Sequence, residues 1–252
     1  VLVDADKMRL ADPDKTVTAK TILIATGGHP TIPDVPGKEH LISSNECFQL
    51  EALPESIVII GAGYIAMEFA SIFNGLGVQV TVLYRGTQIL RDFDDDLRDG
   101  LAVAMRKHGI DLRMNVDIEA VVKEAGAYRV RLKGGDSISA GLVMAATGRA
   151  PNTAGMGLES VGVERGPNGN IVVDEYSKSS VDNIYAVGDV TDRVNLTPVA
   201  IQEANDFAET LFNNKPTPVD YMCIPTAVFS DPELGTVGLT EARARKMYAN
   251  ID

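Results

Sequence analysis

Cysteine is scarce in this sequence. Its 252 residues include only Cys47 and Cys223, which lie far apart along the chain. This number excludes a small disulfide-stapled scaffold, and the spacing excludes a close redox pair or a zinc knuckle. Both thiols are therefore predicted to be ordinary buried or loop residues. No metal site is expected.

Positive charge is also in short supply. The chain has 23 Lys and Arg against 35 Asp and Glu, which gives a net charge of −12 and a pI of about 4.7. Such a chain has no general attraction to phosphate backbones or to anionic membrane surfaces. We therefore expect neither a nucleic acid nor a membrane among its partners.

Long uninterrupted apolar runs are missing as well. The most apolar zone, residues 57–83, is broken by Gly61, Gly63 and Glu68, whereas a membrane span needs about 20 apolar residues in succession. The opening VLVDADKMRL lacks the apolar core of a secretory leader. Because the sequence starts with Val inside a predicted strand, we expect a processed, truncated or partly recorded chain.

What is present is an ordinary globular composition, with 45% apolar and 23% charged residues. The length fits one or two domains. Short apolar runs alternate with longer helical patterns, which is typical of an α/β fold with a parallel sheet. The predicted strands are 1–3, 17–19, 21–25, 57–60, 78–83, 142–146, 171–173 and 184–187, and the predicted helices are 64–76, 94–108 and 198–212.

Turn residues divide these elements. Gly134-Gly135 predicts a tight hairpin turn within an antiparallel meander formed by residues 117–123, 128–132 and 137–139. Residues 11–15 (ADPDK) predict another turn. Residues 29–55 contain four prolines and are predicted to be a connection without core elements.

The sequence from Gly61 to Ala66, GAGYIA, follows a strand and opens a helix. This is the dinucleotide fingerprint with Ala in its third small position. Gly61 allows the tight turn, Gly63 lets the backbone approach a pyrophosphate, and Ala66 lets the helix pack on the strand. The helix N-terminus then favours phosphates. The alternative is a tight strand-to-helix turn without a ligand.

Two arginines predict which nucleotide is bound. An NAD site usually carries an acid at the end of the second strand, but this chain has Arg85 there and Arg91 six residues later. Guanidinium groups suit a 2′-phosphate because they form bidentate charged hydrogen bonds. We therefore expect NADPH rather than NADH; the alternative is a pair of solvated surface arginines.

Asp189 follows another predicted strand, in the sequence IYAVGDV. An acid at a strand end accepts hydrogen bonds from sugar or ribityl hydroxyls. It equally suits the N-cap of a helix that begins at Val190. Both interpretations remain open at this point.

Five motifs in order resemble the class I pyridine nucleotide–disulfide oxidoreductases and, within them, the glutathione reductases. They are IVIIGAGYIAMEFASIFNGLG, YRGTQILRDFD, AATGRAPNT, IYAVGDVTDRVNLTPVAI and PTAVFSDPELGTVGLTEA. The resemblance implies two nested Rossmann-like dinucleotide-binding domains and the start of an α+β dimerisation domain. It assigns residues 1–30 and 149–218 to an incomplete FAD domain, 31–55 to a connection, 56–148 to the NADPH domain and 219–252 to the interface domain.

The resemblance also implies roles for individual residues. Tyr64 would gate the nicotinamide pocket and Glu68 would contact the carboxamide, although each also suits a place in the helix core. The remaining NADPH residues would be Gly61, Ala62, Gly63, Ile65, Arg85, Arg91, Gly148, Arg149 and, through its backbone, Ala227. The FAD residues would be Thr26, Gly27, Asp189 and Thr197.

The implied activity is a relay. NADPH reduces the flavin, whose electrons reduce a protein disulfide and then a small-molecule disulfide, with glutathione disulfide favoured. The family's CxxxxC pair and its His–Glu pair are absent from these residues, so no catalytic residue is assigned. We expect that this chain alone does not reduce disulfides. The intact protein is expected to be a homodimer in the cytosol, with a plastid left open.

Asn205 stands where some family members carry a substrate-binding arginine, which leaves a related disulfide open as the substrate. A dihydrolipoamide dehydrogenase or mercuric reductase relative is an alternative. Another is a nucleotide-binding module without catalysis.

Overall fold

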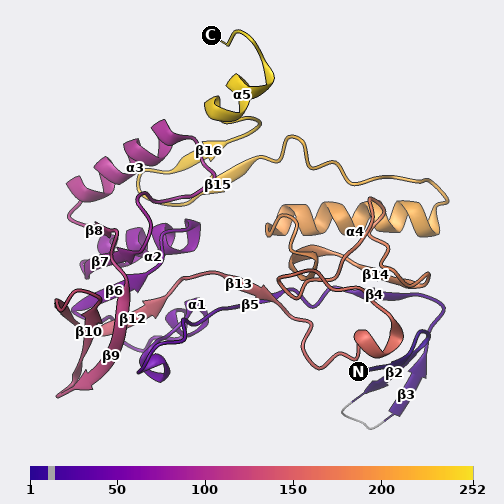
Figure 1. Ribbon diagram of the computed structural model, residues 1–252, viewed down its shortest axis with the longest axis horizontal. Coiled ribbons are helices and arrows are strands. Elements are labelled where there is room, and N and C mark those ends of the chain that lie inside the picture. Colours follow the sequence, from indigo (N-terminus) through magenta and orange to yellow (C-terminus); the bar gives the residue numbers. More distant parts are fainter. Residues whose placement is uncertain (11–14, 252) are drawn as a thin grey trace. The chain divides into compact units, whose positions relative to one another are not determined.

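The computed structural model describes residues 1–10 and 15–251 (Figure 1). The chain divides into two compact units. Unit 1 comprises Val1–His29 and Arg149–Met222, and unit 2 comprises Pro30–Gly148 and Cys223–Asp252. The turn predicted at 11–15 lies outside the described residues except for Lys15. None of the helices in the described part of the chain combines the length and apolar character that a membrane crossing requires.

Unit 2 is built on four parallel strands in the order β12-β6-β7-β8. They span Leu142–Ala145 (β12), Ser56–Ile60 (β6), Gln79–Tyr84 (β7) and Asp111–Met114 (β8). The first three confirm predicted strands to within one residue. β8 was not predicted, because only Leu112 of its four residues is buried.

The sheet has two buried faces because successive side chains of a strand alternate between them. Ile57 and Ile59 face a core shared with the helices α2 (Tyr64–Gly75) and α3 (Asp95–Lys107). Val58 and Ile60 face a second core, which a three-stranded antiparallel sheet covers (Figure 1). A strand buried on both faces reads as a continuous apolar run, as SIVII does.

The antiparallel sheet confirms the predicted meander. Its strands β9 (Ile118–Glu124), β10 (Ala127–Leu132) and β11 (Ser137–Ala140) lie in the order β11-β10-β9. Gly134 and Gly135 have φ values of 113° and 98° in the last turn, a conformation that favours glycine.

Residues 30–55 form a connection that includes short helical elements. They contain the 3₁₀ helix η1 (Lys38–His40) and the short helix α1 (Ser44–Cys47), which Ser43 and Glu46 cap reciprocally. Ile42 forms a parallel bridge with Met144 and therefore extends the sheet beyond β12. Neither short helix buries a residue, as expected of a connection, but the bridge made by the partly buried Ile42 was not predicted.

The C-terminal part of unit 2 packs on α2. The hairpin of β15 (Thr226–Val228) and β16 (Leu234–Thr236) is followed by α5 (Glu241–Met247). The Ser71 side chain on α2 accepts a hydrogen bond from the Asp231 amide at 3.1 Å.

Unit 1 has a smaller parallel pair at its centre. β4 (Ile22–Ile24) pairs with β14 (Ile184–Ala186), and the long helix α4 (Thr197–Phe212) follows. Short elements surround them: the antiparallel strands β1 (Leu2–Asp4), β2 (Lys7–Leu10) and β3 (Lys15–Thr18), and the 3₁₀ helices η2 (Glu159–Val161) and η3 (Gly188–Thr191). The strand predicted at 171–173 is wrong, because Ile171 makes only an isolated bridge with Arg165.

The chain passes from one unit to the other at two places, and the two segments there, called the first and second crossover segments, pair with each other. β5 (Gly28–Pro30) pairs with β13 (Arg149–Pro151), although the two are far apart in sequence. The Thr31 amide donates to the Gly148 carbonyl at 2.9 Å, and the Thr147 hydroxyl donates to the Thr31 carbonyl at 2.8 Å. β4 ends at Ile24 and β12 ends at Ala145, so each crossover segment begins shortly beyond the carboxyl end of a strand.

Candidate functional site

The glycine turn lies at the carboxyl end of β6. Gly61 has a φ of 130°, and a Cβ added there would lie 2.2 Å from the Ala146 carbonyl oxygen. Only glycine fits this position without moving the backbone. The Gly61 amide donates to the Leu83 carbonyl at 2.9 Å, which joins the turn to the end of β7.

Gly63 occupies the N-cap position of α2, and no side chain caps the helix there. A Cβ on Gly63 would meet no atom within 4 Å, so the space in front of the helix is open. Ala62 and Ala66 are buried, and they bring helix and strand together. An uncapped helix N-terminus behind open space fits the pyrophosphate of a dinucleotide.

Tyr64 and Ile65 form the first turn of α2 and are partly buried against the core of the sheet. One turn later, the Glu68 carboxylate accepts a hydrogen bond from the Phe229 amide at 3.0 Å. Ala227 lies two residues before Phe229, on β15, and is exposed. The structure therefore brings the elements that carry Glu68 and Ala227 together.

Arg85 and Arg91 lie on the loop that follows β7. Both side chains are exposed, and neither takes part in an ion pair among the described residues. The Leu90 amide donates to the Ala62 carbonyl at 2.8 Å, which ties this loop to the glycine turn. Arg91 therefore follows directly on a residue bound to the fingerprint.

Gly148 lies two residues beyond Ala146, whose carbonyl faces Gly61. The Ala146 amide donates to the Ile60 carbonyl at 2.8 Å, so the ends of β12 and β6 adjoin. Gly148 has a φ of 138°, which favours glycine. The second crossover thus begins beside the glycine turn.

Asp189 lies inside η3 in unit 1, with a side chain 26% exposed. The N-cap alternative is wrong, because Val187 holds that position and no side chain caps the helix. Arg149 places its Nε 3.8 Å from the Asp189 carboxylate and donates through Nη2 to the Gly28 carbonyl at 2.6 Å. Arg149, predicted to approach NADPH, is thus placed with the predicted flavin residue.

The other predicted flavin residues also lie in unit 1. Thr26 and Asn152 exchange two hydrogen bonds, at 2.8 and 2.9 Å. Gly27 has a φ of 66° and open space around it. Thr197 is exposed at the start of α4, which no side chain caps. A partly buried carboxylate that can accept from sugar hydroxyls, an open glycine and an uncapped helix start that favours phosphate together fit a sugar phosphate such as that of FAD.

Sequence reasoning missed a buried acid, Glu203, on α4. It lies four residues after Val199 and four before Phe207, both of which are buried. An acid at helical spacing between two core residues was the available signal.

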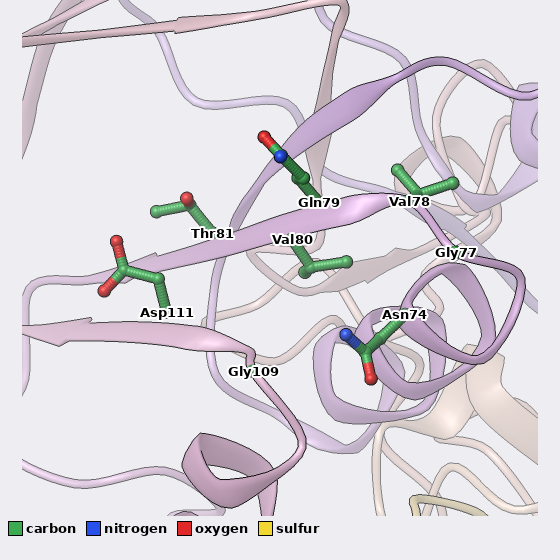
Figure 2. A pocket seen from close by; sticks show the side chains of 8 residues that line it. All are labelled: Asn74, Gly77, Val78, Gln79, Val80, Thr81, Gly109 and Asp111. Atoms are coloured by element: carbon green, nitrogen blue, oxygen red, sulfur yellow. The ribbon is translucent and has the colours of Figure 1, made fainter.

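A separate cavity of about 460 Å³ lies beside the first half of β7 (Figure 2). Its lining residues are Asn74, Gly77, Val78, Gln79, Val80, Thr81, Gly109 and Asp111. Ligands of open α/β sheets bind beyond the carboxyl ends of the strands. This cavity lies at the opposite ends and contains none of the predicted site residues.

Comparison with known proteins gives a consistent result. A model of the family described as "Pyridine nucleotide-disulphide oxidoreductase" matches residues 1–204. The glutathione reductase of Burkholderia cepacia is 54% identical over 237 residues, which is 94% of this chain and 53% of that protein. The chloroplastic/mitochondrial glutathione reductase of Pisum sativum is 48% identical, over 94% of this chain and 43% of that protein. The trypanothione reductase of Leishmania donovani is 45% identical, over 96% of this chain and 50% of that protein.

Solved structures agree in fold. The HOCl-induced flavoprotein disulfide reductase RclA of Escherichia coli, as a Cu(II) complex, has a TM-score of 0.94 at 29% identity, over 100% of this chain and 58% of that one. LpdA from Mycobacterium tuberculosis has a TM-score of 0.86 at 28% identity, over 96% of this chain and 53% of that one. The predicted resemblance and α/β dinucleotide-binding fold are confirmed. The chain spans about half the length of the curated relatives it matches.

Proposed function

Because this chain belongs to the pyridine nucleotide-disulphide oxidoreductases, we propose that it forms the nucleotide-binding part of an NADPH-dependent flavoprotein that reduces a small-molecule disulfide. Relatives named glutathione reductase favour glutathione disulfide as the substrate. Relatives named trypanothione reductase, together with Asn205, keep a related disulfide as the second candidate. The observation that carries the NADPH proposal is the pair of exposed arginines on a loop tied to the glycine turn.

In this proposal the turn and the N-terminus of α2 bind the NADPH pyrophosphate. Arg85 and Arg91 pair with the 2′-phosphate, which NADH lacks. Ala62, Ile65 and Gly148 line the nucleotide, while Tyr64, Glu68 and the Ala227 backbone contact the nicotinamide end. Asp189 accepts hydrogen bonds from flavin ribityl hydroxyls, and Thr197 approaches the ring with Thr26 and Gly27 nearby.

When bound, NADPH and FAD supply the hydride and electron transfer. The residues of this chain supply binding and orientation. For Arg149 we propose two roles, an approach to NADPH by motif position and a pairing with Asp189 that the 3.8 Å separation supports. By the same resemblance we propose a homodimer that uses residues 219–252, in the cytosol or in a plastid.

The arginine proposal is tested with the double variant Arg85→Ala/Arg91→Ala. Each charged hydrogen bond contributes about 1.5–3 kcal/mol, so NADPH affinity should fall by at least about tenfold per arginine. NADH affinity should stay within about threefold of that of the wild type. Titration of nucleotide fluorescence with both coenzymes measures this. Arg106→Ala is the matched control, because Arg106 is also an exposed arginine but lies on α3, away from the loop that follows β7. It should leave NADPH affinity unchanged. Equal wild-type affinities for NADPH and NADH would contradict the proposal.

Activity is tested with the full-length protein and with the 252-residue chain. The full-length protein should oxidise NADPH when glutathione disulfide is added, whereas this chain should not, because Cys47 and Cys223 form no redox motif. Reduction of trypanothione disulfide instead would select the second candidate. Full-length protein that binds NADPH but reduces no disulfide would be a binding module without catalysis.

A further inference from the structure

Glu203 is a buried acid that the proposed function does not use. Its side chain lies on the core-facing side of α4, and the residue is 2% exposed. Burying a carboxylate is costly unless hydrogen-bond donors replace the lost water. The partners of Glu203 therefore indicate its role.

Both oxygens of the Glu203 carboxylate are engaged. Oε2 accepts a hydrogen bond from the Gly188 amide at 2.5 Å, and Oε1 accepts one from the Tyr221 hydroxyl at 2.6 Å. The Arg193 guanidinium in turn donates to the Tyr221 oxygen at 3.1 Å and lies over its ring. Arg193 is itself held by the carbonyls of Val173 and Asp174. The carboxylate is thus fixed by a chain of donors.

Tyr221 acts as a donor throughout the ordinary pH range. Burial, which is the larger cause, and the hydrogen bond to Glu203 raise the pKa of Tyr221 to about 12. Its hydroxyl proton therefore stays in place between the phenol and the carboxylate. This arrangement leaves Oε2 directed at a single backbone amide.

That amide belongs to the turn that carries Asp189. Gly188 has a φ of 74°, and a Cβ there would lie 3.2 Å from the Ala200 side chain, so the turn lies against the first part of α4. The peptide plane before Gly188 sets where η3 begins and hence where the Asp189 side chain lies. One hydrogen bond to a buried, fixed carboxylate holds that plane.

We propose that Glu203 is a positioning residue for flavin binding, which holds the Gly188 amide so that the Asp189 carboxylate is presented to the ribityl chain. The inference rests on the proposed function, because it takes Asp189 as a flavin ligand. Glu203 itself touches no cofactor. Its contribution is a buried acceptor at one place on α4.

The test compares two replacements of Glu203 in the full-length, flavin-loaded protein. Glu203→Leu keeps a similar volume but removes the acceptor, so FAD should dissociate about tenfold faster. Glu203→Gln restores an acceptor oxygen for Gly188, so FAD should dissociate from it at about the wild-type rate. Recovery of free-flavin fluorescence after dilution follows the dissociation.

The matched control is Asp206→Asn, which changes another buried acid on α4. Its carboxylate accepts from Gln202 at 2.7 Å. It should lower the thermal midpoint without changing the rate of FAD release. A fast rate in this variant equal to that of Glu203→Leu would overturn the proposal, because general loosening of α4 would then explain both.

Tyr221→Phe keeps the test decisive if Glu203→Leu does not fold. It removes one hydroxyl from the chain of donors, and FAD release should accelerate about threefold. A wild-type rate in the folded Glu203→Leu variant, or in Tyr221→Phe where the former fails to fold, would overturn the positioning role alone. A wild-type protein that binds no FAD would instead overturn the proposed function and this inference with it.

Discussion

Alanine substitutions at Gly61 and Gly63 should separate the stability of unit 2 from its ability to bind a nucleotide. At Gly61 a Cβ would lie 2.2 Å from the Ala146 oxygen and 2.7 Å from its carbon, at a φ of 130°. Backbone strain costs about 1–3 kcal/mol and forced overpacking about 1–3 kcal/mol. Gly61→Ala should therefore lower the free energy of unfolding by about 2–6 kcal/mol, a large share of the about 5–15 kcal/mol typical of a protein.

Gly63→Ala makes the same chemical change in the same turn but meets no atom within 4 Å. Its φ of −77° is ordinary for alanine, so the free energy of unfolding should change by less than about 1 kcal/mol. The added methyl group instead occupies the open space in front of α2. NADPH affinity should therefore fall by at least about tenfold, since one lost phosphate contact is enough.

Urea unfolding of both variants measures the free energies, and NADPH titration of the folded protein measures binding. Gly61→Ala should lose stability, whereas Gly63→Ala should lose NADPH binding without losing stability. A wild-type free energy of unfolding for Gly61→Ala would refute the predicted steric clash with Ala146. A wild-type NADPH affinity for Gly63→Ala would refute the placement of the pyrophosphate in front of α2.

Two further predictions concern single side chains of unit 2. Burial and, to a smaller extent, the charge of Glu46 raise the pKa of the Cys47 thiol from 9.0 to about 11. Alkylation at pH 8 should therefore label the exposed Cys223 first. Labelling of Cys47 should accelerate as the pH rises towards 11. Since the unfolded thiol loses its proton first, the free energy of unfolding should fall between pH 9.0 and about 11, and Cys47→Ala should remove that part of the fall. Glu68→Ala removes the acceptor of the Phe229 amide, so hydrogen exchange at that amide should accelerate about tenfold while exchange at Val130 stays unchanged. An unchanged exchange rate at Phe229 would show that the carboxylate does not hold β15.

The strongly patterned elements were predictable, and the weakly patterned ones were not. The strand at Ser56–Ile60 and the helix that starts at Tyr64 follow from an apolar run, a glycine turn and a helical stripe. Asp111–Met114 was missed, because a mostly exposed edge strand carries almost no hydrophobic signal. Ile171 is buried through a bridge in a loop, so its apolar character was misread as a strand.

The candidate site shows the same limit. Local motifs located the residues of the glycine turn and the following arginines, since fingerprint and spacing act within a few positions. The hydrogen bond between Glu68 and the Phe229 amide joins elements far apart in the chain, and no local pattern predicts it. Arg149 was predicted from its motif to approach NADPH, but its proximity to Asp189 depends on how two distant segments fold.

The pairing of the two crossover segments bears on the order in which the chain folds. Thr31 and Thr147 are 116 positions apart, yet they are joined by a hydrogen bond. Closing a flexible loop of that length costs about 4 kcal/mol in chain entropy. If residues 31–147 fold first, their own contacts offset this loss of chain entropy. The folded segment then shortens the length of flexible chain that separates β4 from β14. The parallel pairing of Ile22 with Ile184 then closes a much shorter loop, and we expect it to form only after the interposed segment has folded.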